Sequence, residues 1–175
     1  MLKKSILFSL AVLLIVSCDE VDKMLTFRID GRTTIRVESN ASPIALPLEI
    51  PTPEVTSNSQ QQYENNNTHA SLVKDVKLEA LRLTITDPSA KTFSFLKTIR
   101  IFISADQTSE IELAFAENIS SDATTLELTT TKEKLDAYIK ASSYNLRTEV
   151  ITDEALTESV DIQADLKFLV TADTY

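Results

Sequence analysis

Apolar and polar residues alternate with a period of two along most of the chain after residue 24. This period is typical of a β-strand with one buried face. The clearest run covers 160–172, where every second residue from Val160 to Ala172 is apolar. Further alternating runs cover 25–29, 35–37, 81–85, 99–103, 111–115, 126–128 and 144–150.

The segment 25–37 is interrupted by Asp30-Gly31, a dipeptide that favours a hairpin turn. A two-residue loop there would pair Phe27 with Thr34 and mix apolar and polar side chains on one face. We therefore expect an odd-length loop, which restores one apolar face. Gly31, the only glycine, would then be a bulge or a left-handed residue in a three-residue turn.

The connections between the runs carry weaker signals. Four prolines over 43–53, interleaved with aliphatic residues, predict an edge strand or an extended crossing segment, with a polyproline ligand motif as the alternative. The polar stretch 57–68 predicts a loop or an exposed hairpin end. Residues 72–76 suggest a short helical turn, and Leu78, out of phase with the next strand, suggests a bulge near Ala80.

One segment, 130–140, has the period of a helix, and Thr130 with Glu133 fits a capping box at its start. About nine or ten short strands with this one short helix predict an all-β fold, an antiparallel β-sandwich, because one-faced strands need a second sheet to cover them. The pattern broadly resembles immunoglobulin-like or late-embryogenesis-type sandwiches.

The first 17 residues differ from the rest, because Lys3 and Lys4 precede an apolar run over 6–16. A positive start followed by a short apolar run is typical of a signal peptide. A helix over that run would reach about 16 Å, well short of the roughly 30 Å hydrocarbon core of a bilayer. We expect the segment to be a targeting signal and not a permanent membrane anchor.

The apolar run ends at Ile15-Val16-Ser17-Cys18, which resembles the lipobox of bacterial lipoproteins. The resemblance implies that the Cys18 thiol receives a diacylglycerol, that a peptidase cuts before Cys18, and that the new amino terminus is acylated. Two or more acyl chains, palmitate for example, anchor a protein stably, whereas one chain holds only marginally. An ordinary secretory signal followed by a chance cysteine is the alternative.

Three acids, Asp19, Glu20 and Asp22, follow Cys18. They resemble the sorting signal of surface lipoproteins of the Bacteroidota, which implies a lipid-anchored location on the outer membrane at the cell surface. Asp directly after Cys also resembles the inner-membrane retention signal of enterobacterial lipoproteins. A solvated tether without a sorting role, and a location on the periplasmic face, remain as alternatives.

The expected organisation is a lipoprotein signal peptide over 1–17, an acidic tether over 18–23 and one β-sandwich domain over 24–175. Without residues 1–17 the chain has 158 residues and a formal charge of −11. That length buries a core without disulfides. The negative charge argues against a nucleic-acid partner, one cysteine excludes an internal disulfide, and one glycine argues against a phosphate-binding loop.

Candidate catalytic and metal-binding residues are few, and we expect no catalytic residue, no metal and no cofactor. The single histidine, His69, follows an Asn-rich stretch and is interpreted as a surface residue. Tyr138 and Tyr144 are at core-facing phases and, with no tryptophan, leave a thin platform for stacking sugars. Asp153-Glu154 and 19–22 offer oxygen ligands for calcium, but solvated turn acids are the preferred interpretation.

These observations favour a non-catalytic binding or structural role at the cell envelope, with a protein or glycan partner of unknown identity. The first alternative is a hydrolase of envelope polymers that uses Asp or Glu, which predicts converging acids with shifted pKa values. The second is a carrier of an apolar ligand, which requires an internal cavity of roughly 300 Å³ or more. Four phenylalanines could line such a cavity: Phe93, Phe95, Phe102 and Phe115.

Overall fold

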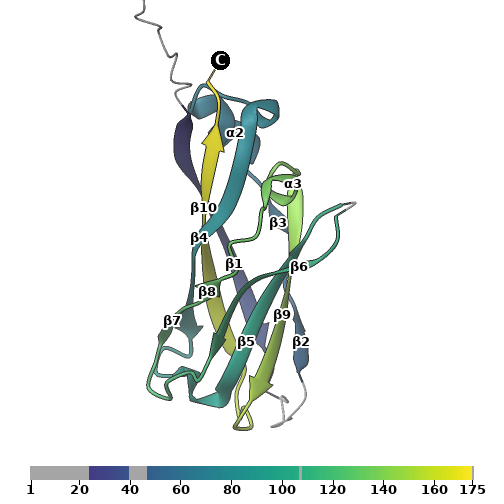
Figure 1. The fold of residues 1–175 in the computed structure, drawn as a ribbon. Helices are drawn as coiled ribbons and strands as arrows, with labels where there is room; N and C mark the ends of the chain where they lie inside the picture. The colour runs from purple at the N-terminus through teal and green to yellow at the C-terminus, as the bar shows by residue number, and fades with distance from the viewer. Residues whose placement is uncertain (1–23, 40–46, 107, 175) are drawn as a thin grey trace, which may run out of the picture.

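Two antiparallel sheets pack face to face in an elongated sandwich (Figure 1), which confirms the predicted all-β class. The structure is a computed structural model that describes residues 24–39, 47–106 and 108–174, with Pro51 described only in its backbone. Residues 1–23, 40–46, 107 and 175 lie outside this description.

The first sheet has the strand order β1-β10-β4-β7. Its strands are β1 (Leu25–Val37), β10 (Val160–Ala172), β4 (Val73–Asp87) and β7 (Thr125–Glu127). The chain's first and last described strands therefore pair, with Leu25 opposite Ala172 and Val37 opposite Val160. This pairing brings both ends of the described chain to one end of the sandwich.

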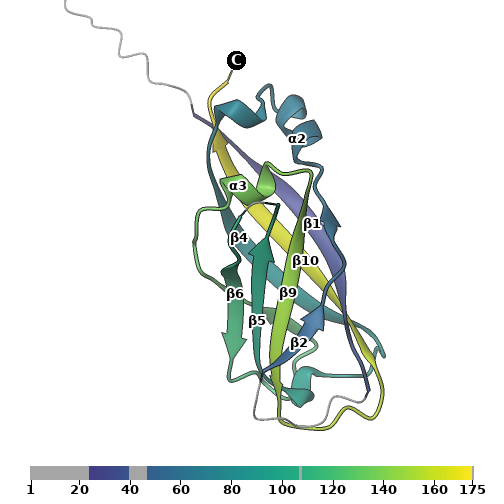
Figure 2. The same cartoon turned by 90° about the vertical axis from the view of Figure 1, so that its right-hand side faces the viewer.

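The second sheet has the order β2-β9-β5-β6-β8, and β3 also pairs with β9 (Figure 2). Its strands are β2 (Leu48–Pro51), β3 (Val55–Thr56), β5 (Leu96–Ser104), β6 (Ile111–Glu117), β8 (Thr129–Thr130) and β9 (Ser143–Thr152). The helices are α2 (Ser59–Asn65), α3 (Asp136–Ile139) and the 3-10 turns η1 (Ala70–Leu72) and η2 (Phe93–Phe95). Among the described residues, none of the helices has both the length and the apolar character that crossing a bilayer demands.

The core lies between the sheets and is built from the inward positions that the alternation predicts. Every second residue of β10 from Val160 to Ala172 is buried. Tyr144 from β9 packs edge-to-face on Phe168 from β10, with ring centroids 6.2 Å apart, and so joins the two sheets. The burial of Tyr138 and Tyr144 that their phase predicts is confirmed.

The hairpin predicted at Asp30-Gly31 is wrong, because β1 runs straight through both residues. Gly31 has no positive φ and lies opposite Leu166 in an unbroken ladder with β10. A Cβ on Gly31 would lie 2.7 Å from the hydroxyl oxygen of Tyr144. The glycine is therefore needed for the close approach of an inward aromatic side chain, and not for a turn.

Two further predictions about helices are wrong. The segment 57–68 contains helix α2, whose Tyr63 side chain is buried and stacks edge-to-face on Phe27, with ring centroids 6.1 Å apart. The capping box at Thr130 and Glu133 does not form, since α3 starts only at Asp136 and Thr130 belongs to β8. In both cases a buried aromatic or a sheet contact overrides the local polar pattern.

Other local predictions are confirmed. The register between β4 and β10 shifts where Lys167 faces Ala80 and Phe168 faces Leu78, which leaves Glu79 as a bulge next to the predicted position. The alternating runs 99–103 and 111–115 lie in strands β5 and β6, which pair as an antiparallel hairpin. The proline-rich segment supplies β2 at the edge of the second sheet, whereas its residues 43–46 lie outside the described part.

Candidate binding groove on the first sheet

The proposed lipidation residue Cys18 and the proposed sorting residues Asp19, Glu20 and Asp22 lie outside the described residues. Their roles therefore stay predictions. The described chain starts at Met24, whose side chain is exposed, immediately before β1. The described chain thus begins at the end of the sandwich where α2 and the last residues of β10 lie (Figure 1).

The remaining candidate residues are scattered over the fold. The Nδ1 atom of His69 is 2.6 Å from the hydroxyl oxygen of Ser71, just before η1. Asp153 and Glu154 are exposed in the connection from β9 to β10. Within the described ranges no three His, Cys, Asp or Glu residues converge as ligands of a metal ion.

The four phenylalanines do not share one environment. Phe93 and Phe95 are buried in the core. The rings of Phe102 and Phe115 each lie under an arginine side chain instead: Arg147 is 4.2 Å from the first ring centroid and Arg100 is 5.4 Å from the second.

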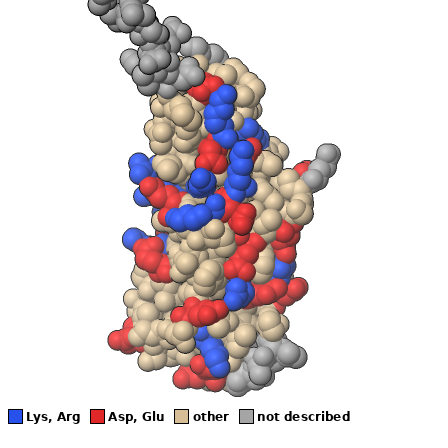
Figure 3. All heavy atoms as spheres, in the orientation of Figure 1, with Lys and Arg blue, Asp and Glu red and all other residues tan. Residues whose placement is uncertain are grey.

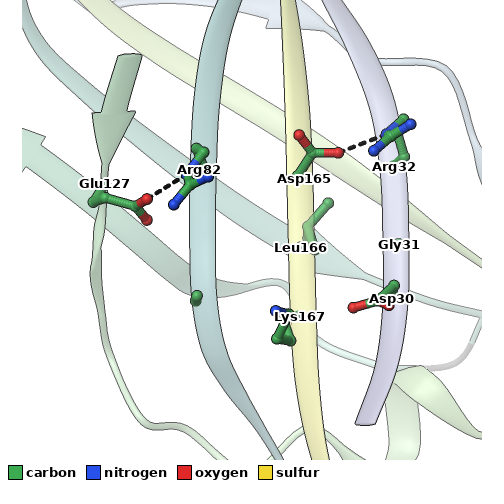
Figure 4. Close-up of a pocket in the computed structure, with 9 residues that line it drawn as sticks. Asp30, Gly31, Arg32, Arg82, Glu127, Asp165, Leu166 and Lys167 are labelled. Carbon is green, nitrogen blue, oxygen red and sulfur yellow. Dashed lines mark hydrogen bonds and ion pairs between the residues drawn. The ribbon is translucent and has the colours of Figure 1, made fainter.

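A row of alternating charges crosses the outer face of the first sheet. The register places Glu127 opposite Arg82, Arg82 opposite Asp165, and Asp165 opposite Arg32. The Nε atom of Arg32 donates to Asp165 over 2.6 Å, and the Nε atom of Arg82 donates to Glu127 (Figure 4). Four neighbouring strands of the sheet therefore contribute to one row, in which each charged side chain faces one of opposite charge.

The next row along the strands is different, because Asp30 faces Lys167 and Lys167 faces Ala80. The short side chain of Ala80 and the end of β7 at Glu127 leave the outer face hollow at this point. The hollow is a groove of about 470 Å³, which we call the charged groove. Its lining residues are Asp30, Gly31, Arg32, Ala80, Arg82, Glu127, Asp165, Leu166 and Lys167.

The charged groove holds more unpaired donors than acceptors. Among the described residues, the hydrogen bonds of Arg32 and Arg82 use only their Nε atoms, so the Nη atoms of both guanidinium groups form no hydrogen bond with a described residue. Neither Lys167 nor Asp30 forms an ion pair with a described residue within 4.0 Å. Figure 4 shows Lys167 and Asp30 beside each other, one row away from the paired charges.

Asp165 is the fixed centre of this site. Burial raises its pKa, but hydrogen bonds from Gln163 and Arg32, together with the charge of Arg82, outweigh burial and hold the pKa below its ordinary value. Asp165 is therefore ionised at neutral pH and orients Arg32, whereas Glu127 orients Arg82. The charges of the three cations and three anions in the lining sum to zero, whereas the chain without its first 17 residues is strongly acidic.

The second sheet also carries arginines on its outer face, but these are more fully engaged. Arg147 donates to Glu110 through Nε and Nη2, with distances from 2.6 to 3.0 Å, and its Nη1 atom bonds to Glu49 and Glu149. All of its nitrogen atoms thus have carboxylate partners. The pocket beside Gly31 and Tyr144 measures about 20 Å³, about the size of one water.

Sequence analysis alone did not identify the charged groove. Its charged residues occupy the outward positions of four strands that are distant in sequence, and outward charges are normally solvated. The one available signal was Ala80, a small residue among long polar neighbours, which the sequence analysis interpreted only as the place of a bulge. The comparisons add no name to this site: no protein-family model matches the chain, and no curated protein matches its sequence.

Proposed function

We propose that this chain is a lipid-anchored protein of the bacterial cell envelope that binds a polar ligand in the charged groove and catalyses no reaction. The observation that carries the binding role is the groove itself, because it combines a volume typical of small-ligand sites with unpaired donors held on a rigid sheet. The observation that carries the anchor is the resemblance of Ile15-Val16-Ser17-Cys18 to a lipobox.

The charge distribution is compatible with an anchor at the Met24 end. Five residues separate Cys18 from Met24 and span at most about 20 Å, so this end would lie close to the bilayer. The connections at the opposite end of the sandwich carry most of the exposed loop acids. The acids at this end are Glu38, Asp122, Asp153, Glu154 and Glu158 in the connections, and Asp87 at the end of β4. Anchored in this way, the protein would hold its most acidic end away from an anionic lipid surface.

The carboxyl groups favour binding over hydrolysis. A carboxyl group that acts as a general acid near neutral pH needs a raised pKa. The described carboxyl groups with a clear shift have lowered pKa values instead, and in three of them an arginine donates a hydrogen bond to the carboxylate. The groups are Glu79, Glu110, Asp122 and Asp165. The charged groove is also a poor match for an apolar cargo.

The anchor is tested by Cys18→Ala. We expect this variant to accumulate as an unprocessed precursor without acyl chains, whereas the wild-type chain partitions into membranes. Metabolic labelling with a palmitate analogue and gel mobility report both properties. Normal processing and membrane partition of the variant would disprove the anchor.

The surface location is tested by replacing Asp19, Glu20 and Asp22 with Ser, Gln and Ser and then shaving intact cells with protease. We expect the wild-type chain to be cut and the variant to be protected while still lipidated. Replacing three distal acids, Asp153, Glu154 and Glu158, changes the charge equally and serves as the control. Equal cutting of all three chains would remove the sorting role, and protection of the wild type would place the domain in the periplasm.

Occupancy of the groove is tested without knowing the ligand. A cysteine introduced by Ala80→Cys lies on the groove floor, and one introduced by Thr34→Cys lies on the same outer face outside the lining. We expect a maleimide to label position 80 more slowly in cell envelopes than in the purified chain, and position 34 equally in both. Equal rates at position 80 would argue against a bound ligand. Polymer cleavage that Asp165→Asn abolishes would replace the binding role by the hydrolase alternative.

A further inference from the structure

We propose that the ligand of the charged groove is a hydroxylated monocarboxylate, with a uronic-acid unit of a saccharide as the model case. This inference rests on the proposed binding role of the groove and specifies the chemistry that its lining recognises. It depends on the donors of Arg32, Arg82 and Lys167, the acceptor of Asp30 and the floor at Ala80.

The donor inventory points to an oxyanion. Each Nη atom of a guanidinium group carries two N–H donors and an ammonium group carries three. The Nη atoms of Arg32 and Arg82 form no hydrogen bond with a described residue, and Lys167 forms no ion pair with one within 4.0 Å, whereas Asp165 and Glu127 already accept from the Nε atoms. A ligand that fills the groove must therefore supply acceptors, and charged acceptors form the stronger hydrogen bonds.

Strand geometry places the carboxylate between Arg82 and Lys167. Lys167 lies two residues along β10 from Asp165, which faces Arg82, so the two cationic residues are separated by about 7 Å along the strands and about 5 Å across them. Ala80 lies beside both and presents only a methyl group. A planar carboxylate above this methyl group can accept from Nη of Arg82 on one side and from Nζ of Lys167 on the other.

Net charge favours a single negative charge on the ligand. The lining is neutral as a whole, and the chain without residues 1–17 carries a formal charge of −11. A phosphate monoester, with up to two charges at neutral pH, is repelled more strongly by such a protein than a carboxylate. The unpaired carboxylate of Asp30 also accepts hydrogen bonds from neutral hydroxyl groups but repels a second anion. Hydroxyl groups next to one carboxylate fit this combination.

The test is calorimetric titration of the full chain in detergent micelles with three probes: the methyl glycoside of galacturonate, which carries one carboxylate, its methyl ester and inorganic phosphate. We expect the galacturonate glycoside to bind, and the ester and phosphate to bind at least tenfold more weakly. Binding should weaken as salt increases, because the partly exposed cations are screened. Equal binding of the ester would overturn the role of the carboxylate, and tighter binding of phosphate would overturn the choice of anion.

Variants locate the site. Lys167→Gln should weaken binding of the galacturonate glycoside at least tenfold, and Ala80→Gln should abolish it by filling the floor. The matched controls are Arg36→Gln, which removes an arginine paired with Asp161 outside the groove, and Thr34→Gln, which lengthens an outward side chain outside the lining. Both controls should bind as the wild type does.

The outcomes separate this inference from the proposed function. Full binding by Ala80→Gln, or no binding of the galacturonate glycoside to the wild-type chain, overturns the inference. If protection of position 80 in cell envelopes persists in that case, the groove still binds a ligand and only its chemistry was wrongly assigned. If that protection is also absent, the binding role fails as well.

Discussion

Gly31→Ala tests whether Gly31 is needed for a close contact or for a turn. The added Cβ would lie 2.7 Å from the Tyr144 hydroxyl oxygen, closer than ordinary packing allows, and Tyr144 is only 3% exposed and packed on Phe168. Overpacking of this kind typically costs about 1–3 kcal/mol. Replacing glycine by alanine within a strand otherwise stabilises by about 0.5–1 kcal/mol. We therefore expect a net loss of up to about 2 kcal/mol in the free energy of unfolding.

The decisive measurement is a double-mutant cycle with Tyr144→Phe, which removes the clashing oxygen. The next atoms around the added Cβ belong to Phe168 and Leu166, at 3.6 and 3.7 Å, which is ordinary contact. In the Tyr144→Phe background, Gly31→Ala should thus be stabilising by about 0.5–1 kcal/mol, a coupling of about 1–3 kcal/mol. Urea unfolding of the four chains measures it. An equal loss in both backgrounds would refute the contact and would instead indicate backbone strain at Gly31.

Two other perturbations follow from single side chains. Ser59 lies close enough to lower the pKa of Tyr63, but burial dominates and raises that pKa to about 12. No hydrogen bond of normal geometry reaches the Tyr63 hydroxyl from a described residue. Tyr63→Phe should therefore raise the free energy of unfolding by about 1 kcal/mol in a urea titration, and a loss of that size would show that the hydroxyl has a partner. Glu110 accepts hydrogen bonds from Arg147, which lower its pKa. The Glu110 carboxylate therefore binds a proton more readily in the unfolded chain than in the folded one. The Glu110–Arg147 pair stabilises the fold at pH values above the unfolded pKa of Glu110, near 4.5, and this stabilisation is lost as the pH falls through its lower folded pKa. Glu110→Gln should accordingly cost up to about 1 kcal/mol at pH 7 and nothing at low pH, whereas a cost that does not depend on pH would exclude the ionic contribution.

The location of the strands was largely predictable from the sequence, because period-two burial is a local property of a chain with one face in the core. Strand β10 follows its predicted alternation throughout, and the bulge next to Ala80 was visible as a break in phase. The alternation also continues through the inward positions Gly31 and Thr33 of β1, but neither residue is strongly apolar. The local turn signal at Asp30-Gly31 therefore concealed a continuous strand.

The tertiary structure alone decided which strands are neighbours. Arg32, Arg82, Glu127 and Asp165 lie on four strands that are far apart in the sequence, and only the order β1-β10-β4-β7 brings them into one row. Likewise, Tyr63 of α2 packs on Phe27 from β1, a contact between segments that are distant in the sequence. Period and composition act within a few residues, whereas the order and register of a sheet depend on contacts between distant segments. For this reason the sequence predicts the sandwich and a location at the cell envelope, and the charged groove becomes visible only in the folded chain.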